Sequence, residues 1–167
     1  MQIEEFNAMS EQEAAATVRP CVAIDSFVDA VVGARPYADL DSLLAGAAAQ
    51  TDTWTDAEVE AALADHPRLG EKVAGTSRSA RLSRREQAGV DREDAELLAR
   101  LREASERYEA RFGRIYLVRA AGRSTEELLA ILERRLRNDD ATELQVTKEQ
   151  LGEIALLRLQ GLFEGAA

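Results

Sequence analysis

The sequence predicts an all-α fold: a single compact multi-helix domain over residues 1–167, with about seven or more helices. Alanine and leucine dominate its apolar residues, and with Glu and Arg they have the best helix propensities. β-branched residues are sparse and aromatic residues make up only 5% of the chain, which disfavours a sheet. Ser or Thr also stands repeatedly three positions before Glu, a spacing typical of helix starts. The single cysteine, Cys21, excludes an internal disulfide.

The N-terminal third carries signals for successive helices. Ser10 and Glu13 have the spacing of a capping box, in which hydroxyl and carboxylate accept hydrogen bonds from N–H groups at a helix start. A second helix is expected over residues 21–34, closed by Gly33. The alanine-rich residues 39–50 are expected to form a third.

A helix and a long loop should follow. Thr55 and Glu58 form another capping box, and the helix they open must end near His66, because the residue before Pro67 is disfavoured in the α region. Residues 67–82 are rich in Gly and Ser and predict a long loop. Long ordered loops are frequently functional.

The next capping box is expected at Ser83 and Glu86, opening a long helix that Gly113 ends. One face of this helix is predicted to be buried, through Leu97, Leu98, Leu101, Ala104, Tyr108 and Phe112.

The C-terminal third begins with the one stretch that has strand character. Residues 114–120 are apolar and predict a short extended segment. Ser124 and Glu127 then open a helix over residues 124–137, and a final helix is expected over residues 140–163.

Composition restricts the class of partner. The net charge is −10, from 21 basic and 31 acidic side chains, and such a surface repels nucleic acids and anionic lipids. No apolar run reaches 18 residues, and the acidic start does not resemble a signal peptide. We therefore expect a cytoplasmic protein with no nucleic-acid or membrane partner.

The common motifs for metal, phosphate and nucleophilic chemistry are missing. One His, one Cys and no HExxH leave no metal site to predict. Neither GxGxxG nor GxxxxGK[ST] occurs, and no GxSxG nucleophile elbow is present.

A local reversal of charge surrounds the only histidine. An imidazole can transfer a proton near neutral pH, and Ser83, Glu86 and Gln87 can hold a polar ring. Glu71 is the only acid between His66 and Arg85. The same interval holds six basic residues: Arg68, Lys72, Arg78, Arg81, Arg84 and Arg85. These residues make a small-anion site around His66 possible.

Structural explanations compete with this one. A histidine at a helix C-terminus often only contacts the last carbonyls and the negative end of the helix dipole. Capping accounts for Ser83 and Glu86, and the arginines can form a solvated face. From residue types alone both interpretations stay open.

Three motifs in combination resemble a known family. HPRLG at 66–70, SRREQAG at 83–89 and YEARFG at 108–113 resemble the 2-oxo-4-hydroxy-4-carboxy-5-ureidoimidazoline (OHCU) decarboxylases of uric acid degradation. The likeness extends over essentially the whole chain. It includes Phe6-Asn7, Arg35-Pro36-Tyr37 and the segment from Arg119 to Ser124.

The resemblance implies an all-helical, usually homodimeric enzyme without a cofactor, which converts OHCU, a small anionic ureido-imidazoline, to (S)-allantoin. It makes His66 the catalytic acid/base, while Arg114 replaces an aromatic residue found in many relatives. The implied substrate-binding positions are Pro67, Ser83, Glu86, Gln87, Tyr116, Leu117, Val118, Arg119 and Ala120.

Two other functions stay open from the sequence. One is a non-catalytic helical module of the same fold, for dimerisation or anion binding. The other is a lyase or hydrolase that acts on a related ureido-imidazolinone. The intact His66, Glu86 and Gln87 argue against the first.

Overall fold

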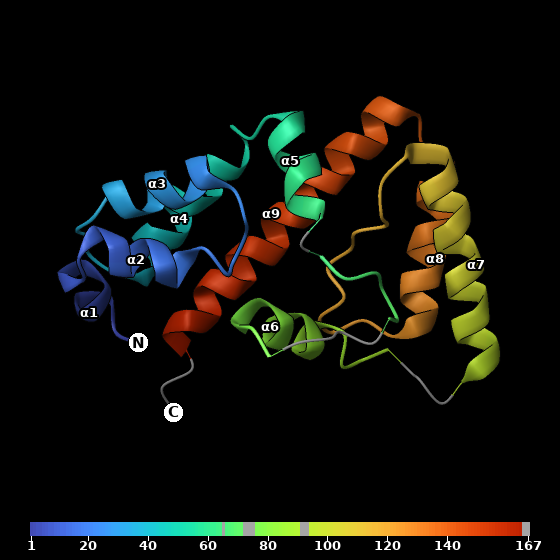
Figure 1. Cartoon of the computed structure of the whole chain (residues 1–167), viewed down its shortest axis with the longest axis horizontal. Coiled ribbons are helices and arrows are strands. Elements are labelled where there is room, and N and C mark those ends of the chain that lie inside the picture. Colours follow the sequence, from blue (N-terminus) through green and yellow to red (C-terminus); the bar gives the residue numbers. More distant parts are fainter. Residues whose placement is uncertain (65, 72–75, 91–93, 165–167) are drawn as a thin grey trace. The chain divides into compact units, whose positions relative to one another are not determined.

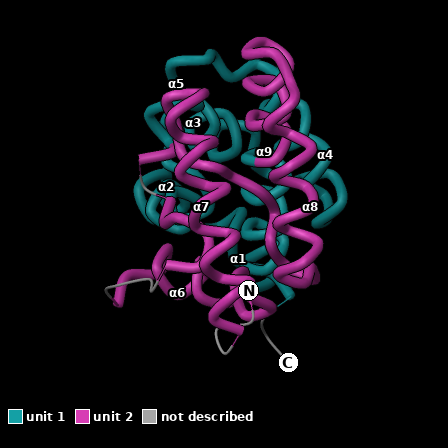
Figure 2. The backbone as a smooth tube through the Cα atoms, turned by 90° about the vertical axis from the view of Figure 1, so that its right-hand side faces the viewer, with its two compact units in different colours: residues 1–62, 151–167 teal, residues 63–150 magenta. Residues whose placement is uncertain are grey.

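The computed structural model describes residues 1–64, 66–71, 76–90 and 94–164, and every regular element in these ranges is a helix (Figure 1). The predicted all-α class is therefore confirmed. The chain divides into two compact units (Figure 2). Unit 1 comprises residues 1–62 and 151–167, and unit 2 comprises residues 63–150. None of the helices in the described ranges is long and apolar enough to cross a membrane.

Unit 1 is built from short capped helices. The capping boxes predicted at Ser10 and Thr55 are both present. Phe6 packs edge-on against Phe163, and Phe27 packs edge-on against Trp54. The helices are α1 (Ile3–Ala8), α2 (Glu11–Val18), α3 (Asp25–Gly33), α4 (Leu40–Thr51), nearly all of α5 (Asp56–Leu63) and the C-terminal part of α9 (Asp140–Glu164).

Asn7 and Tyr37, two motif residues in unit 1, are joined by a pair of hydrogen bonds. The side-chain amide of Asn7 donates to the carbonyl oxygen of Tyr37 at 2.8 Å, and the Tyr37 N–H donates to Asn7 Oδ1 at 2.9 Å. Arg35 donates to the carbonyl oxygens of Phe6 and Met9. These positions therefore tie α1 to the chain that follows α3.

Unit 2 contains α6 (Arg78–Glu86), α7 (Ala95–Phe112), α8 (Thr125–Arg135) and the N-terminal part of α9. Helix α7 ends at Gly113, whose φ of +69° is the left-handed conformation that glycine adopts without strain. The predicted buried face of α7 is confirmed: Leu97, Leu101, Ala104, Tyr108 and Phe112 are buried, and Leu98 packs against their cluster.

The segment between α7 and α8 is an irregular part of unit 2. Figure 1 shows that α7 and α8 run in the same direction, so the chain must return along their length to start α8. Residues 115–120 make this return outside any helix or strand, and Tyr116, Val118 and Ala120 are buried in the unit 2 core. The predicted extended segment thus serves as a crossover.

The prediction was wrong for α6. The helix starts at Arg78, where the Ser77 hydroxyl accepts a hydrogen bond from the Ala80 N–H, so residues 78–82 are not loop. Ser83 lies inside the helix and Glu86 is its last residue, which removes the predicted capping box. Several serines in this stretch can cap a helix, and the helix formers after Ser77 decide which one does. Residues 72–75 of the predicted loop lie outside the described ranges.

The long helix predicted to open at Ser83 and the helix predicted over residues 21–34 both start later than expected. The long helix starts at Ala95 with Asp94 as its cap, and the helix predicted over residues 21–34 starts at Asp25. An acidic residue in the first turn is favoured by the helix dipole, which fits the start at Asp25. Helix α1 was not predicted, because it is short and its cap is Gln2.

Candidate active site

His66 stands just after α5, as the proline that follows it predicts. Its backbone N–H donates to the Leu63 carbonyl at 3.0 Å, which closes the helix end. The His66 residue is half-buried, and so is Pro67. A ring in this position can exchange protons with a bound ligand and with solvent.

Ser83, Glu86 and Gln87 lie on one face at the end of α6. Residues three and four positions apart in a helix are neighbours, and the Gln87 N–H donates to the Ser83 carbonyl at 3.1 Å. Ser83 and Gln87 are buried, whereas Glu86 is half-buried. Because capping no longer explains Ser83 and Glu86, the structural explanation for these two residues loses its main support.

A hydrogen bond joins the two motifs that are far apart in sequence. The N–H of Gly70 donates to Gln87 Oε1 at 3.0 Å. Gly70 has a φ of +81°, which a residue with a side chain rarely adopts. The bond places the loop that follows His66 against the end of α6, so HPRLG and SRREQAG belong to one local structure.

The same end of α6 approaches the turn before α8. A Cβ atom built on Gly89 would lie 2.7 Å from the carbonyl oxygen of Arg123, so only glycine fits there without movement. This close approach brings residues 87–89 beside the C-terminal end of the irregular segment.

The segment that carries Tyr116 to Ala120 is anchored by α8 and α9. The Leu117 carbonyl accepts a hydrogen bond from Arg135 Nη1 at 2.7 Å, and the Arg119 N–H donates to Gln150 Oε1 at 3.0 Å. The Tyr116 hydroxyl donates to the Leu128 carbonyl, and its burial raises the pKa of that hydroxyl. The predicted backbone-contact segment is therefore held in a defined conformation.

Arg135 belongs to a buried network that this segment shares. Its Nε and Nη2 contact Glu143 Oε1 at 2.8 and 2.6 Å, and the Tyr108 hydroxyl donates to the same oxygen. Burial acts to lower the pKa of Arg135, but hydrogen bonding to Glu143 and its charge raise it above the usual value. The guanidinium lies against the rings of Tyr108 and Tyr116 and stays charged.

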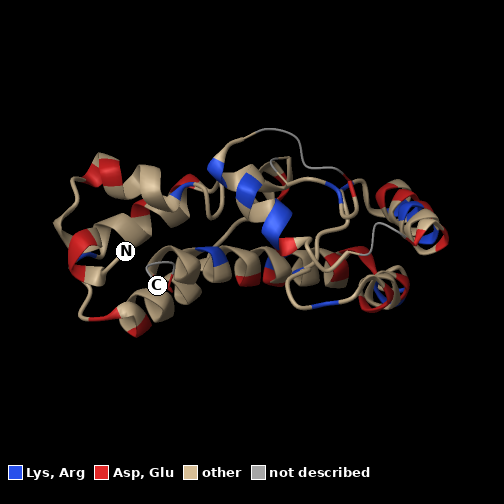
Figure 3. Ribbon diagram, turned by 90° about the horizontal axis from the view of Figure 1, so that it is seen from below, with Lys and Arg blue, Asp and Glu red and all other residues tan. Residues whose placement is uncertain are grey.

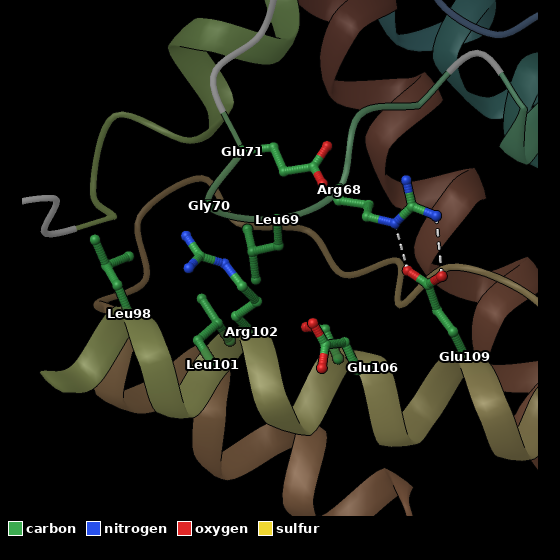
Figure 4. Close-up of a pocket in the computed structure, with 10 residues that line it drawn as sticks. Arg68, Leu69, Gly70, Glu71, Leu98, Leu101, Arg102, Glu106 and Glu109 are labelled. Carbon is green, nitrogen blue, oxygen red and sulfur yellow. Dashed lines mark hydrogen bonds and ion pairs between the residues drawn. The ribbon is translucent and has the colours of Figure 1, made fainter. Parts of the chain in front are cut away.

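A hollow of about 300 Å³ lies between the loop after His66 and α7 (Figure 4). Arg68 spans its edge and pairs with Glu109 through Nε at 2.6 Å and Nη2 at 3.0 Å. Leu69 points from the loop towards α7, where it packs against the unit 2 core. The ion pair and this apolar contact hold the loop against α7, in addition to its hydrogen bond to Gln87 at the end of α6.

The basic residues of the predicted anion site are divided between elements. Arg68 is paired with Glu109, and Lys72 lies outside the described ranges. The remaining four belong to α6, whose ribbon is largely blue in Figure 3: Arg78, Arg81, Arg84 and Arg85.

Sequence patterns did not point to Arg135, Glu143 or Gln150. The first two continue apolar stripes, since Arg135 follows Leu128 and Leu132 on α8, and Glu143 precedes Leu151 on α9, at helical spacing. A charged residue in such a stripe is the signal that could have identified this pair. Gln150 has no such signal, because its contact depends on how the irregular segment packs.

Comparison with known proteins agrees with these motifs. The family model of OHCU decarboxylase matches residues 7–160. The 2-oxo-4-hydroxy-4-carboxy-5-ureidoimidazoline decarboxylase of Amia calva is 30% identical over an alignment 167 positions long, gaps included, which spans 98% of this chain and 95% of that protein. The uric acid degradation bifunctional protein of Bacillus sp. (strain TB-90) is 28% identical over 131 residues, 77% of this chain and 25% of that protein.

Two solved structures share the fold. A crystal structure of OHCU decarboxylase in the presence of (S)-allantoin aligns with a TM-score of 0.73 and 20% identity, over 93% of this chain and 99% of that one. A crystal structure of (S)-allantoin synthase aligns with a TM-score of 0.70 and 15% identity, over 96% of this chain and 54% of that one. With the family match over nearly the whole sequence, the conclusion is that the chain belongs to the OHCU decarboxylase family.

Proposed function

We propose that the chain decarboxylates OHCU to (S)-allantoin, as a carboxy-lyase of urate degradation. The family match supports the reaction, and it extends over residues of both units, which supports residues 1–167 as one catalytic domain. The observation that carries the site is the hydrogen bond from Gly70 to Gln87, because it joins the His66 loop to the polar face of α6.

The chemistry of the substrate fits this set of residues. The bond between the carboxylate and the hydroxyl-bearing ring carbon breaks, and its electron pair moves towards the neighbouring imine to leave an enol. CO₂ leaves and the imine nitrogen takes up a proton; the enol then gives up its O–H proton as the carbon that bears the ureido group gains one from one face, giving one enantiomer. Because the substrate holds its own electron sink, the protein must supply orientation and a proton, and no cofactor is required.

Each predicted residue has a role in this proposal. His66 donates the proton, and Pro67 stops α5 so that the imidazole stands beside the ligand. Ser83, Glu86 and Gln87 hold the polar groups of the ring and the ureido chain. The backbone of residues 116–120 provides the remaining contacts: Tyr116, Leu117, Val118, Arg119 and Ala120.

Assembly and location follow from the resemblance and are proposed with it. The enzyme acts as a homodimer in the cytoplasm. A mass measured by light scattering at twice that of the chain supports the dimer, and the mass of one chain contradicts it.

Replacing His66 tests the reaction. Fresh OHCU is generated from urate with urate oxidase and hydroxyisourate hydrolase, and circular dichroism follows chiral allantoin, since spontaneous decay gives racemate. His66→Asn should lower the rate about 10²–10⁴-fold, the usual contribution of a positioned acid/base. Its melting temperature should stay near that of the wild type, because the contact that closes the helix uses the backbone N–H.

A matched pair extends this test to α6. Glu86→Gln should lose most activity and melt normally, whereas Glu103→Gln, an exposed change on α7, should change neither. Near-normal (S)-allantoin production by His66→Asn would contradict its role. A wild-type protein that gives only racemate would indicate a non-catalytic module or a different substrate.

A further inference from the structure

Two consecutive peptide groups of the crossover segment are fixed by side chains of α8 and α9. The carbonyl of Leu117 accepts from Arg135, and the N–H of Arg119 donates to Gln150. Residue 118 lies between these two anchors, so both peptide groups that flank it are oriented.

The planar trans peptide decides where the other polar groups point. In each such peptide the C=O and the N–H point in opposite directions. The N–H of Val118 shares a peptide with the Leu117 carbonyl, so it points away from Arg135. The carbonyl of Val118 shares a peptide with the Arg119 N–H, so it points away from Gln150.

Arg135, the first of the two anchors, is itself held by several partners. Arg135 is buried, and its remaining donors contact Glu143 and Thr147. Asn138 donates to the other oxygen of Glu143 at 3.0 Å. A guanidinium with this many partners has little rotational freedom, so the Leu117 peptide cannot rotate without losing its hydrogen bond to Arg135 and leaving a buried donor of that guanidinium without this acceptor.

We propose that Arg135 and Gln150 are positioning residues for the decarboxylation: they turn the Leu117 and Arg119 peptides so that the N–H and C=O of Val118 face the substrate as a donor–acceptor pair. Such a pair is complementary to an amide edge of the ring or of the ureido group, which offers one acceptor and one donor. The inference rests on the proposed function and adds residues that lie behind the substrate contacts.

Gln150 offers the cleaner variants, because Arg135 supports the core. Gln150→Met removes the acceptor for the Arg119 N–H at similar size, and Gln150→Glu retains an oxygen there. Gln145→Met makes the same exchange at an exposed position of α9 and is the matched control.

The readouts are KM, which a loss of folded protein alone does not move, and the enantiomeric excess of allantoin, compared at equal concentrations of folded protein because spontaneous decay of OHCU gives racemate. Gln150→Met should raise KM roughly tenfold, the usual effect of one misplaced hydrogen bond, and lower the enantiomeric excess. Gln150→Glu should recover most of both losses, and Gln145→Met should match the wild type. Wild-type KM and enantiomeric excess in Gln150→Met, or equal losses in Gln150→Met and Gln150→Glu, would overturn the proposal.

Amide hydrogen exchange in the wild-type protein provides a second test of the Val118 contacts. With (S)-allantoin added as the probe, the Val118 amide should gain protection, whereas the Arg119 amide should be protected with and without it. A Val118 amide that is already protected in the free protein overturns the inference. A wild type that makes no (S)-allantoin refutes the proposed function instead, so the two failures are distinct.

Discussion

Glycines at the edges of the candidate site show how single residues set its geometry. Gly70 adopts a left-handed φ and presents its N–H to Gln87, while Gly89 brings the chain against the Arg123 carbonyl. Gly70 is required by its backbone conformation, and Gly89 is required because there is no space for a Cβ atom. Both lie in the motifs that led from the sequence to the family.

Gly89→Ala should both destabilise the protein and weaken catalysis. Its new Cβ would lie 2.7 Å from a backbone oxygen that cannot swing aside, and such overpacking costs about 1–3 kcal/mol. Because Gln87 is two residues away, kcat/KM should fall as well. Gly161→Ala is the control, since a Cβ there meets nothing within 4 Å and alanine favours a helix. Thermal melting and the chiral assay check both, and a normal melting temperature in Gly89→Ala would contradict the packing argument.

At the scale of elements, capping signals predicted helix starts where one strong candidate stood alone. Ser10, Thr55 and Ser124 all cap as expected. Serine-rich residues 76–83 offered several starts, and sequence alone could not choose Ser77 over Ser83.

The site shows the same division between local and long-range information. His66 and the residues of SRREQAG could be proposed as site residues from motifs, because these motifs follow one another in a fixed order along the chain. The contacts that join them could not, since the Gly70–Gln87 and Arg119–Gln150 hydrogen bonds link residues far apart in sequence. Only tertiary packing decides such pairs.

Ser77→Ala tests the observed start of α6. Losing an N-cap hydroxyl costs about 1 kcal/mol, which should lower the melting temperature by about 2–4 °C. Ser79→Ala lies within the helix and should not lower it, because alanine has the higher helix propensity. If the two variants melted alike, the helix would not depend on the Ser77 cap.

For the whole molecule, charge is unevenly distributed. The chain carries a net charge of −10, yet α6 includes four arginines and only one acid, Glu86 (Figure 3). An anionic substrate is repelled by the molecule as a whole and attracted by this helix. Local attraction of this kind raises the rate at which the substrate binds, and salt screens it.

Arg85→Gln should therefore reduce kcat/KM roughly twofold to threefold at low ionic strength and leave kcat unchanged. The difference should disappear in about 0.5 M salt, where the Debye length is only a few ångströms. Arg134→Gln, an exposed change at the end of α8, controls for net charge. An equal effect of both variants would show that total charge, and not its position on α6, governs capture.

The order of the chain also bears on its biogenesis. Unit 2 is contiguous, whereas the core of unit 1 includes both Phe6 and Phe163, whose ring centroids lie 5.7 Å apart. A ribosome releases helices α1 to α4 before unit 2, yet the C-terminal part of α9 that completes their core is synthesised after it. Unit 2 can form its hydrophobic core while translation continues. The N-terminal helices keep apolar faces exposed until the C-terminal part of α9 has been synthesised. Helices α1 to α4 are therefore made before unit 2 but complete their core after it, and chaperones would need to shield them in the interval.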